Sequence, residues 1–176
     1  RCNDSLSVNI CSVGLDARIG TDVASYKRIP VLQGFWAYAA SAAVNVIKGI
    51  AEPLEVEICG QVLAGEMTMV CVCNGRYYGG GFCPVPEADP ADGMLEVLLV
   101  DKVRRYQVPG LIGKYKAGRY RELPRYIRHF RTDRLTIRAK GPTAINLDGE
   151  LRRAEEIHIS LAEEKLRFFY PKGLTW

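Results

Sequence analysis

The chain of 176 residues is 48% hydrophobic and 25% charged, which is the balance of an ordinary globular protein. This composition excludes a disordered chain and a collagen-like repeat, and the length suits one sizeable domain. The formal net charge is +4, and its distribution is more informative than its sum. The longest apolar stretch, residues 31–47, is too short and too polar for a secure membrane span. Because the chain opens at Arg1 without a signal-peptide pattern, we expect a piece of a longer protein.

The first half of the chain predicts a strand, one long helix and a hairpin. Residues 7–15 form an apolar run that ends at a glycine turn, as strands do. Residues 32–50 carry apolar side chains three and four positions apart, and this spacing predicts the main helix. Residues 54–61 and 66–74 are predicted to be two strands joined by a turn at Leu63-Ala64-Gly65.

The second half predicts mostly short strands. Residues 94–103 form a strand, and a broken helical or coil segment rich in glycine and proline follows to about Pro124. Further strands are expected at residues 127–129, 134–139, 143–147, 150–153, 156–161 and 165–170. One helix followed by many short strands predicts a mainly β fold, a two-layer antiparallel β-sandwich with one main helix and a short helical or coil insertion.

The six cysteines are expected to be buried, reduced thiols. Most of them lie in or beside apolar, strand-like runs, where a free cysteine behaves as a small hydrophobic residue. No C-x-x-C pair exists, and His129 and His158 lack the spacing to any cysteine that a zinc site needs. We therefore expect a cytoplasmic protein.

Basic residues are concentrated between Arg104 and Lys140. This segment holds twelve Lys or Arg against only Glu122 and Asp133, and five aromatic residues are interleaved with them. Such an excess favours an anionic partner, whether a phosphate group, an acidic membrane surface or a nucleic acid. A solvated charged face is the alternative, and the residues alone do not choose among these.

Three short motifs could carry chemistry. Asp148-Gly149-Glu150 is typical of a two-residue hairpin turn, and a glutamate just after such a turn could also serve as a general base. Asp89 and Asp92 lie in a proline-rich loop that either is a capped turn or binds a hard cation through oxygen atoms. Asp16 follows the first strand and either caps a helix or faces a cleft. The triple glycine of residues 79–81 lacks the flanking residues of a phosphate-binding loop.

The order of these motifs resembles a known family. The chain shows Asn9-x-x-Ser12-x-Gly14-x-Asp16, an alanine-rich helix, Tyr78-Gly79-Gly80-Gly81, Pro86-x-Ala88-x-x-x-Asp92-Gly93-x-Leu95, then Asp148-Gly149-Glu150, and a closing Phe169-Tyr170-Pro171. Together they strongly resemble the C-terminal domain of the diacylglycerol kinase, sphingosine kinase and bacterial lipid kinase superfamily. The resemblance covers nearly all of the chain, and it favours these kinases over the related NAD kinases, which share the architecture.

The resemblance implies that residues 1–176 are the C-terminal β-sandwich domain of an ATP-dependent lipid kinase. Family members bind ATP through Gly-Gly-Asp-Gly-Thr in an N-terminal domain, and this chain contains no such motif. The full-length protein would transfer the γ-phosphate of ATP to a lipid hydroxyl, such as that of diacylglycerol, in phospholipid metabolism. This chain alone is expected to be inactive, and the sequence does not name the lipid.

The resemblance also implies roles for individual residues. Glu150 matches the general base, and Asp92 matches the aspartate of a structural Mg²⁺ site completed by the main-chain carbonyls of Asp89 and Met94. The residues expected to line the cleft between the domains are Asn9, Ser12, Gly14, Asp16, Asp148 and Gly149.

The expected partners follow from the same resemblance. They are the lipid substrate, the protein's own N-terminal domain and, through the basic segment, an anionic membrane surface, with a homodimer also expected as a possible assembly. The protein would then be cytoplasmic and peripherally membrane-associated. Two other readings stay open: a homologue that has lost kinase activity and serves as a binding or regulatory protein, and a nucleic-acid-binding domain, for which no signature motif is present.

Overall fold

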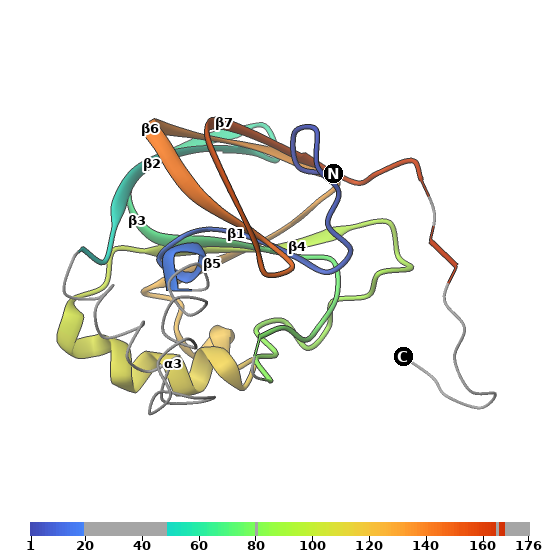
Figure 1. Ribbon diagram of the computed structural model, residues 1–176. Helices are drawn as coiled ribbons and strands as arrows, with labels where there is room; N and C mark the ends of the chain where they lie inside the picture. The colour runs from blue at the N-terminus through green and yellow to red at the C-terminus, as the bar shows by residue number, and fades with distance from the viewer. Residues whose placement is uncertain (20–48, 80, 165, 168–176) are drawn as a thin grey trace, which may run out of the picture.

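Seven antiparallel strands and a short helical layer make up the computed structural model, which describes residues 1–19, 49–79, 81–164 and 166–167 (Figure 1). The strands are β1 (Ile10–Gly14), β2 (Glu52–Ile58), β3 (Gln61–Cys73), β4 (Leu95–Asp101), β5 (Ile127–Thr132), β6 (Arg134–Leu147) and β7 (Glu150–Ser160). The helical elements are η1 (Arg105–Gln107), α3 (Val108–Lys116) and η2 (Tyr120–Glu122). Residues 15–19 are also helical.

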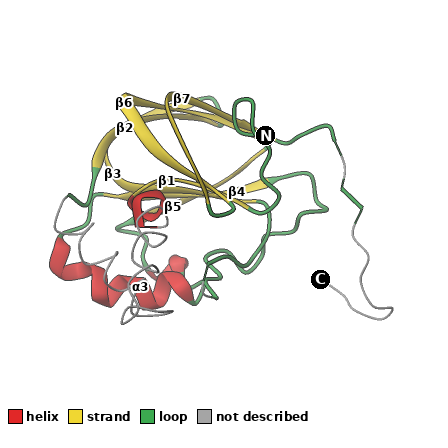
Figure 2. Ribbon diagram, in the orientation of Figure 1, coloured by secondary structure: helices red, strands yellow, loops and turns green. Residues whose placement is uncertain are grey.

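The strands form two layers that belong to one continuous sheet. β1 pairs with β3 and β6, and β2 pairs with the same two strands, so these four close into a small barrel-like ring. The long strands β3 and β6 reach both layers, with β7 added beside β6 and with β4 and β5 added beyond β3 (Figures 1 and 2). The predicted mainly β, two-layer antiparallel fold is confirmed.

Two hydrophobic cores flank the layer that contains β1, β3 and β4. The first core lies between the two layers of strands, and the second lies between this layer and α3. Residues 67–73 of β3 are all buried, because successive side chains point to opposite faces and both faces are covered. Val70 and Val72 enter the first core, whereas Met69, Cys71 and Cys73 enter the second.

The hairpin between β2 and β3 turns earlier than predicted. The turn lies at Cys59-Gly60, where both residues have positive φ angles of 49° and 72°, and not at Leu63-Ala64-Gly65. The short strands predicted after residue 134 also merge in pairs into β6 and β7. Residues 166–167 of the last predicted strand are not extended into a strand, and most of the helix predicted at 32–50 lies outside the described residues.

All six cysteines are free thiols. Cys2, Cys11, Cys71 and Cys73 are buried as expected, but Cys59 is exposed because it occupies the β2–β3 turn. Among the residues that the structure describes, no helix is long and apolar enough to cross a membrane.

Candidate functional site

The end of β1 brings Ser12, Gly14 and Asp16 to one place. Gly14 has a φ of +95°, and a Cβ atom there would lie 2.8 Å from the main-chain oxygen of Thr68. Only glycine allows β1 to approach β3 this closely before the chain turns into the helical residues 15–19. The turn directs Asp16 inward, where its carboxylate accepts a 2.6 Å hydrogen bond from Ser12 Oγ.

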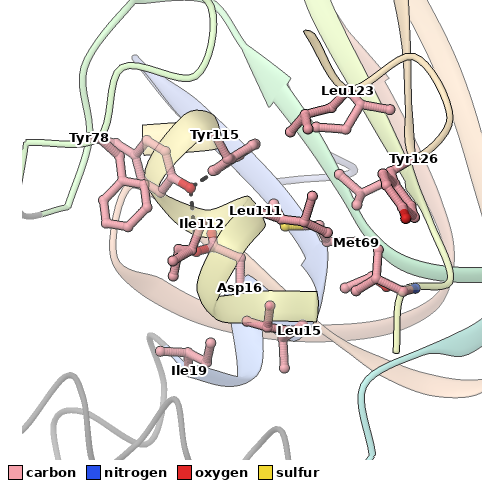
Figure 3. A pocket seen from close by; sticks show the side chains of 16 residues that line it. Leu15, Asp16, Ile19, Met69, Tyr78, Leu111, Ile112, Tyr115, Leu123 and Tyr126 are labelled. Carbon is pink, nitrogen blue, oxygen red and sulfur yellow. Dashed lines mark hydrogen bonds between the residues drawn. The ribbon is translucent and has the colours of Figure 1, made fainter. Parts of the chain in front are cut away.

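Asp16 is a buried acid with several polar neighbours. Burial raises the pKa of its carboxyl group, while hydrogen bonds from Ser12, Tyr78 and Asn146 act in the opposite direction. Figure 3 shows the Tyr78 hydroxyl between Asp16 and Tyr115; it lies 3.4 Å from Asp16 Oδ1 and 3.2 Å from the Tyr115 hydroxyl. The side chain of Asp16 therefore belongs to a small polar group set in an otherwise apolar region.

An apolar pocket of about 100 Å³ lies in the second core beside this polar group. β3 and β4 form one wall and α3 forms another (Figure 3). Among its described lining residues, Asp16 is the only charged one. The apolar lining consists of Leu15, Ile19, Met69, Phe82, Val100, Val103, Val108, Leu111, Ile112, Leu123 and Ile127. Such a pocket can hold a hydrocarbon group and place a polar atom attached to that group beside a carboxylate.

Asp148 anchors the start of β1 to the β6–β7 turn. Its carboxylate accepts hydrogen bonds from the backbone N–H groups of Val8 (2.6 Å), Asn9 (3.2 Å) and Ile10 (2.7 Å), and the Ser7 hydroxyl lies 2.9 Å from Oδ2. Asp148 and Gly149 both have positive φ angles, 51° and 102°, as the predicted two-residue hairpin turn requires. Asp148, one of the residues expected to line the cleft, therefore fixes the backbone before β1 in place.

Glu150 is the first residue of β7 and projects into solvent. Its side chain is 71% exposed and forms an ion pair with Arg152 at 2.9 Å. An exposed carboxylate on a rigid turn remains available to a reacting group that approaches from outside the chain. The structure neither adds to nor removes the role that the resemblance implies for Glu150.

Asn146 connects the turn to Asp16. Its side-chain oxygen accepts a 2.8 Å hydrogen bond from Gly149 N, and its side chain also hydrogen-bonds to Asp16. Because Ser12 and Asn146 are paired residues of β1 and β6, the strand register itself places the two motifs side by side. Asn146 was missed by the sequence analysis, although its place two residues before Asp148 on a predicted strand was a usable signal. Tyr115 lies on α3, within the segment predicted to be helical or coil, and no motif in the sequence indicated that its side chain joins this group.

Asn9 lies at the edge of this arrangement. Its main-chain oxygen accepts a 2.8 Å hydrogen bond from Asn74 N, and its side-chain amide donates to the main-chain oxygen of Tyr77. Asn9 therefore fixes the loop that leads to Tyr78, and Asp16 is the member of the predicted cleft-lining set that directly lines the pocket.

The Asp92 loop lies at the start of β4. Asp92 Oδ1 accepts a 2.8 Å hydrogen bond from Met94 N, and Oδ2 pairs with the Arg131 guanidinium at 2.6 Å. Among the described residues, the carbonyl of Asp89 accepts one hydrogen bond, a long one of 3.3 Å from Asp92 N. The described residues contain no cluster of three or more His, Cys, Asp or Glu side chains arranged to hold a metal ion. The oxygen donors expected from the resemblance, one carboxylate and two carbonyls, are the type that Mg²⁺ or Ca²⁺ prefers.

Seven of the twelve basic residues in the segment are paired with carboxylates, and four of these seven pair with acids from outside the segment. Arg121 pairs with Glu87, Arg128 with Asp101, and Arg138 with Glu55, Glu57 and Glu156. Lys114, Arg119, Arg131 and Arg134 are likewise paired with carboxylates. The basic residues of the segment without an ion pair to a described residue are Arg104, Arg105, Lys116, Arg125 and Lys140. The free positive charge is therefore much smaller than the sequence count implied.

Comparison with known families gives a match over most of the chain. Residues 9–169 match the family described as "YegS C-terminal NAD kinase beta sandwich-like domain". A "Putative lipid kinase" of Staphylococcus carnosus is 23% identical over 175 residues, which are 97% of this chain and 55% of the relative. A "Probable lipid kinase YegS-like" protein of Stenotrophomonas maltophilia is 30% identical over 135 residues, or 73% of this chain and 44% of the relative.

Solved structures show the same fold. The crystal structure of a "putative diacylglycerol kinase" from Bacillus anthracis superposes with a TM-score of 0.63 at 20% identity, and the match covers 92% of this chain and 52% of that one. A second diacylglycerol kinase structure from the same organism gives a TM-score of 0.56 at 16% identity, over 90% of this chain and 47% of the other. The chain therefore spans about half the length of the proteins that it matches.

Proposed function

The chain belongs to the family of YegS C-terminal NAD kinase beta sandwich-like domains, and we propose that it is the lipid-binding part of an ATP-dependent lipid kinase. In the full-length protein a nucleotide-binding domain would hold ATP, and this chain would present the acceptor hydroxyl, for example that of diacylglycerol. The names of the relatives support a lipid kinase and leave the lipid unassigned.

The observation that carries this proposal is the apolar pocket with Asp16 at its edge. A lipid acceptor combines a hydrocarbon chain with one hydroxyl group, and the pocket combines apolar walls with one carboxylate. Its volume of about 100 Å³ admits only one part of a lipid, so the rest of the tail would extend beyond these walls. Burial of the carboxylate strengthens any hydrogen bond that it accepts from a hydroxyl group, because the local dielectric is low.

Two carboxylates then have separate tasks in the proposed reaction. Asp16 would accept the single hydrogen bond of the lipid hydroxyl as the lipid binds, and the hydroxyl would then rotate so that this proton turns from Asp16 to Glu150. Glu150, which is exposed and held by the Asp148-Gly149 turn, would accept the hydroxyl proton as the oxygen attacks the γ-phosphorus in line. The chain from Gly149 N through Asn146 to Asp16 keeps these two groups in fixed relation. The proton thus moves to this chain, while the phosphate is supplied from the nucleotide domain.

The same proposal includes a structural Mg²⁺ at the Asp92 loop. The Asp92 carboxylate and the main-chain carbonyls of Asp89 and Met94 would hold the cation. Because the hydrogen bond to the Asp89 carbonyl is weak, that oxygen could coordinate a cation. When bound, the cation would supply positive charge that fixes the loop. No step of the proton transfer depends on it.

The test of the proposed function measures phosphorylation of diacylglycerol by the full-length protein with labelled ATP. Asp16→Asn should lower kcat/KM by about 10-fold or more, since one hydrogen bond between a charged group and the substrate contributes about 1.5–3 kcal/mol. Leu111→Trp should raise KM by filling the pocket. Asp133→Asn, which changes an exposed carboxylate paired with Arg134, is the matched control. Normal turnover in both pocket variants would refute the assignment of the pocket.

We further propose a membrane-facing patch, made of Arg104, Arg105 and Tyr106. Both arginines are exposed without a carboxylate partner among described residues, and Tyr106 is 72% exposed. The patch immediately precedes α3 and is flanked by Val103 and Val108, which line the pocket. Arginine and tyrosine suit an anionic lipid interface, where each basic residue contributes about 1 kcal/mol.

Vesicle sedimentation of the full-length protein tests this patch. Replacing Arg104 and Arg105 by Gln should weaken binding to phosphatidylglycerol vesicles by about 30-fold, the equivalent of about 2 kcal/mol. Replacing Arg134 and Arg138, which are already paired, should change binding much less. Equal losses in the two double variants would refute the patch and leave only an effect of net charge.

A further inference from the structure

The guanidinium of Arg131 occupies the carboxylate at which the cation is expected. We propose that Arg131 is a built-in competitor of the divalent cation: it holds the Asp92 loop when no metal is bound and weakens metal binding there. This inference rests on the Mg²⁺ site of the proposed function and concerns how that site is regulated.

Arg131 is fixed from two sides. On the sheet, Glu96 of β4 and Arg131 of β5 are directly paired residues. Arg131 Nε lies 3.3 Å from Glu96 Oε1, and Arg131 Nη2 lies 2.6 Å from Asp92 Oδ2. One guanidinium therefore bridges two carboxylates, which matches its planar, forked set of donors.

The buried carboxylate of Glu96 holds the Arg131 side chain in this position. The Glu96 side chain is only 6% exposed, and its second oxygen lies 2.5 Å from His129 Nε2. A buried carboxylate needs a positive or hydrogen-bonding partner, and removal of one member of such a group is costly. Glu96 consequently keeps Arg131 at this position, whether Asp92 pairs with Arg131 or binds a cation.

Asp92 has both of its oxygens in use. Oδ1 accepts from Met94 N, and Met94 is also the residue whose carbonyl is expected to bind the cation. Oδ2 is taken by Arg131. A divalent cation on this carboxylate would lie beside the positively charged guanidinium, and the two would compete for the same negative oxygen atoms.

The competition has two measurable consequences. Without metal, the Asp92 loop is already held to β5 by Arg131, so chelation should lower the melting temperature of the wild-type protein less than that of Arg131→Gln. When Arg131 is replaced by a neutral residue, one carboxylate oxygen is released and a repelling charge is lost. The affinity for Ca²⁺ or Mg²⁺ should then increase by about 10-fold or more.

Calorimetric titration of the full-length protein with Ca²⁺ and with Mg²⁺, in the absence of nucleotide, tests the proposal. The variants are Arg131→Gln, Arg131→Lys and Asp92→Asn. Arg128→Gln is the matched control, because Arg128 lies on the same strand, forms a 2.6 Å pair with Asp101, and points to the opposite face of the sheet. Circular dichroism establishes that each variant is folded, and Arg131→Lys keeps the charge beside Glu96 if the glutamine variant fails to fold.

The expected result is tighter metal binding in Arg131→Gln, a smaller gain in Arg131→Lys, no gain in Arg128→Gln, and loss of the gain when Asp92→Asn is added. Equal affinity in wild type and Arg131→Gln, abolished by Asp92→Asn, would overturn the competition and leave the metal site intact. Absence of binding in every variant would overturn both the metal site and its regulation. Neither result bears on the kinase assignment, which phosphorylation of lipid tests separately.

Discussion

Asp148 and Glu150 lie two residues apart, and we predict that neutralising Asp148 lowers the stability of the fold whereas neutralising Glu150 lowers the catalytic rate. Asp148→Asn should destabilise the fold, because the asparagine side chain offers one acceptor oxygen where the carboxylate offers two. Of the contacts to Ser7, Val8, Asn9 and Ile10, those on Oδ2, at 2.6 and 2.9 Å, would be lost or would face an N–H group. Asparagine tolerates the positive φ of 51°, so backbone strain does not contribute to the measured change in stability.

The size of the effect follows from these contacts. Hydrogen bonds to a charged group contribute about 1.5–3 kcal/mol each, and water can replace part of them because Asp148 is exposed. Two lost bonds then give a decrease of about 2–3 kcal/mol in the free energy of unfolding. Glu150→Gln removes only a surface pair with Arg152 and should cost less than about 0.5 kcal/mol. In the proposed mechanism it should nevertheless lower kcat by at least about 10².

Urea unfolding of each variant gives the stability, and phosphorylation of diacylglycerol by the full-length protein gives kcat. A harmless Asp148→Asn would refute the anchoring role that the hydrogen bonds assign. Near-normal turnover in Glu150→Gln would remove Glu150 from the mechanism. A stability loss of more than about 2 kcal/mol in Glu150→Gln would make its carboxylate structural.

Three further predictions concern stability and activity of the chain. Because burial raises the pKa of Asp16, this carboxyl group stays protonated to a higher pH in the folded protein than in the unfolded chain. Wild type should therefore lose stability relative to Asp16→Asn as the pH rises through that raised pKa, and parallel pH profiles would contradict this. Gly14→Ala should cost about 2–4 kcal/mol in urea unfolding, since its φ is +95° and Thr68 O blocks the new Cβ, whereas Gly65→Ala, with no atom within 4 Å, should be nearly neutral. The 176-residue chain alone should not transfer phosphate from ATP, and saturable turnover by it would contradict the division of labour proposed here.

The sequence predicts the parts of the fold that depend on local pattern. Alternating and continuous apolar runs identify the strands, and Asp148-Gly149 identifies the turn with two positive φ angles. The β2–β3 turn was misplaced because Cys59 is not a typical turn residue. The helix α3 was obscured by Pro109, Gly110 and Gly113; proline is tolerated in the first turn of a helix, and the packing of Tyr115 in the second core compensates for the glycines.

The candidate site was predicted less completely, because it depends on contacts between distant segments. Asn146 meets Asp16 only through the pairing of β1 with β6, a register that no local pattern reveals. The charge of the basic segment was overestimated for the same reason: Arg138 is neutralised by Glu55 and Glu57, which lie about 80 positions earlier in the chain. Counting charges along a sequence measures composition, whereas a partner meets only the charges that folding leaves unpaired.

The layer of β1, β3 and β4 is buried on both faces, and this has a consequence for how the pocket responds to an occupant. Each of these strands contributes alternate side chains to both cores, so a shift that widens the pocket on one face would open voids on the other. This wall is therefore stiff, and its amides should be among the slowest to exchange with solvent. In the proposed function, adaptation to acyl chains of different length or shape would come from the other wall, where α3 is connected to the sheet through the short η1 and η2 segments. If the pocket binds lipid as proposed, substitutions in α3 should change the selectivity among lipids more than substitutions in the strands.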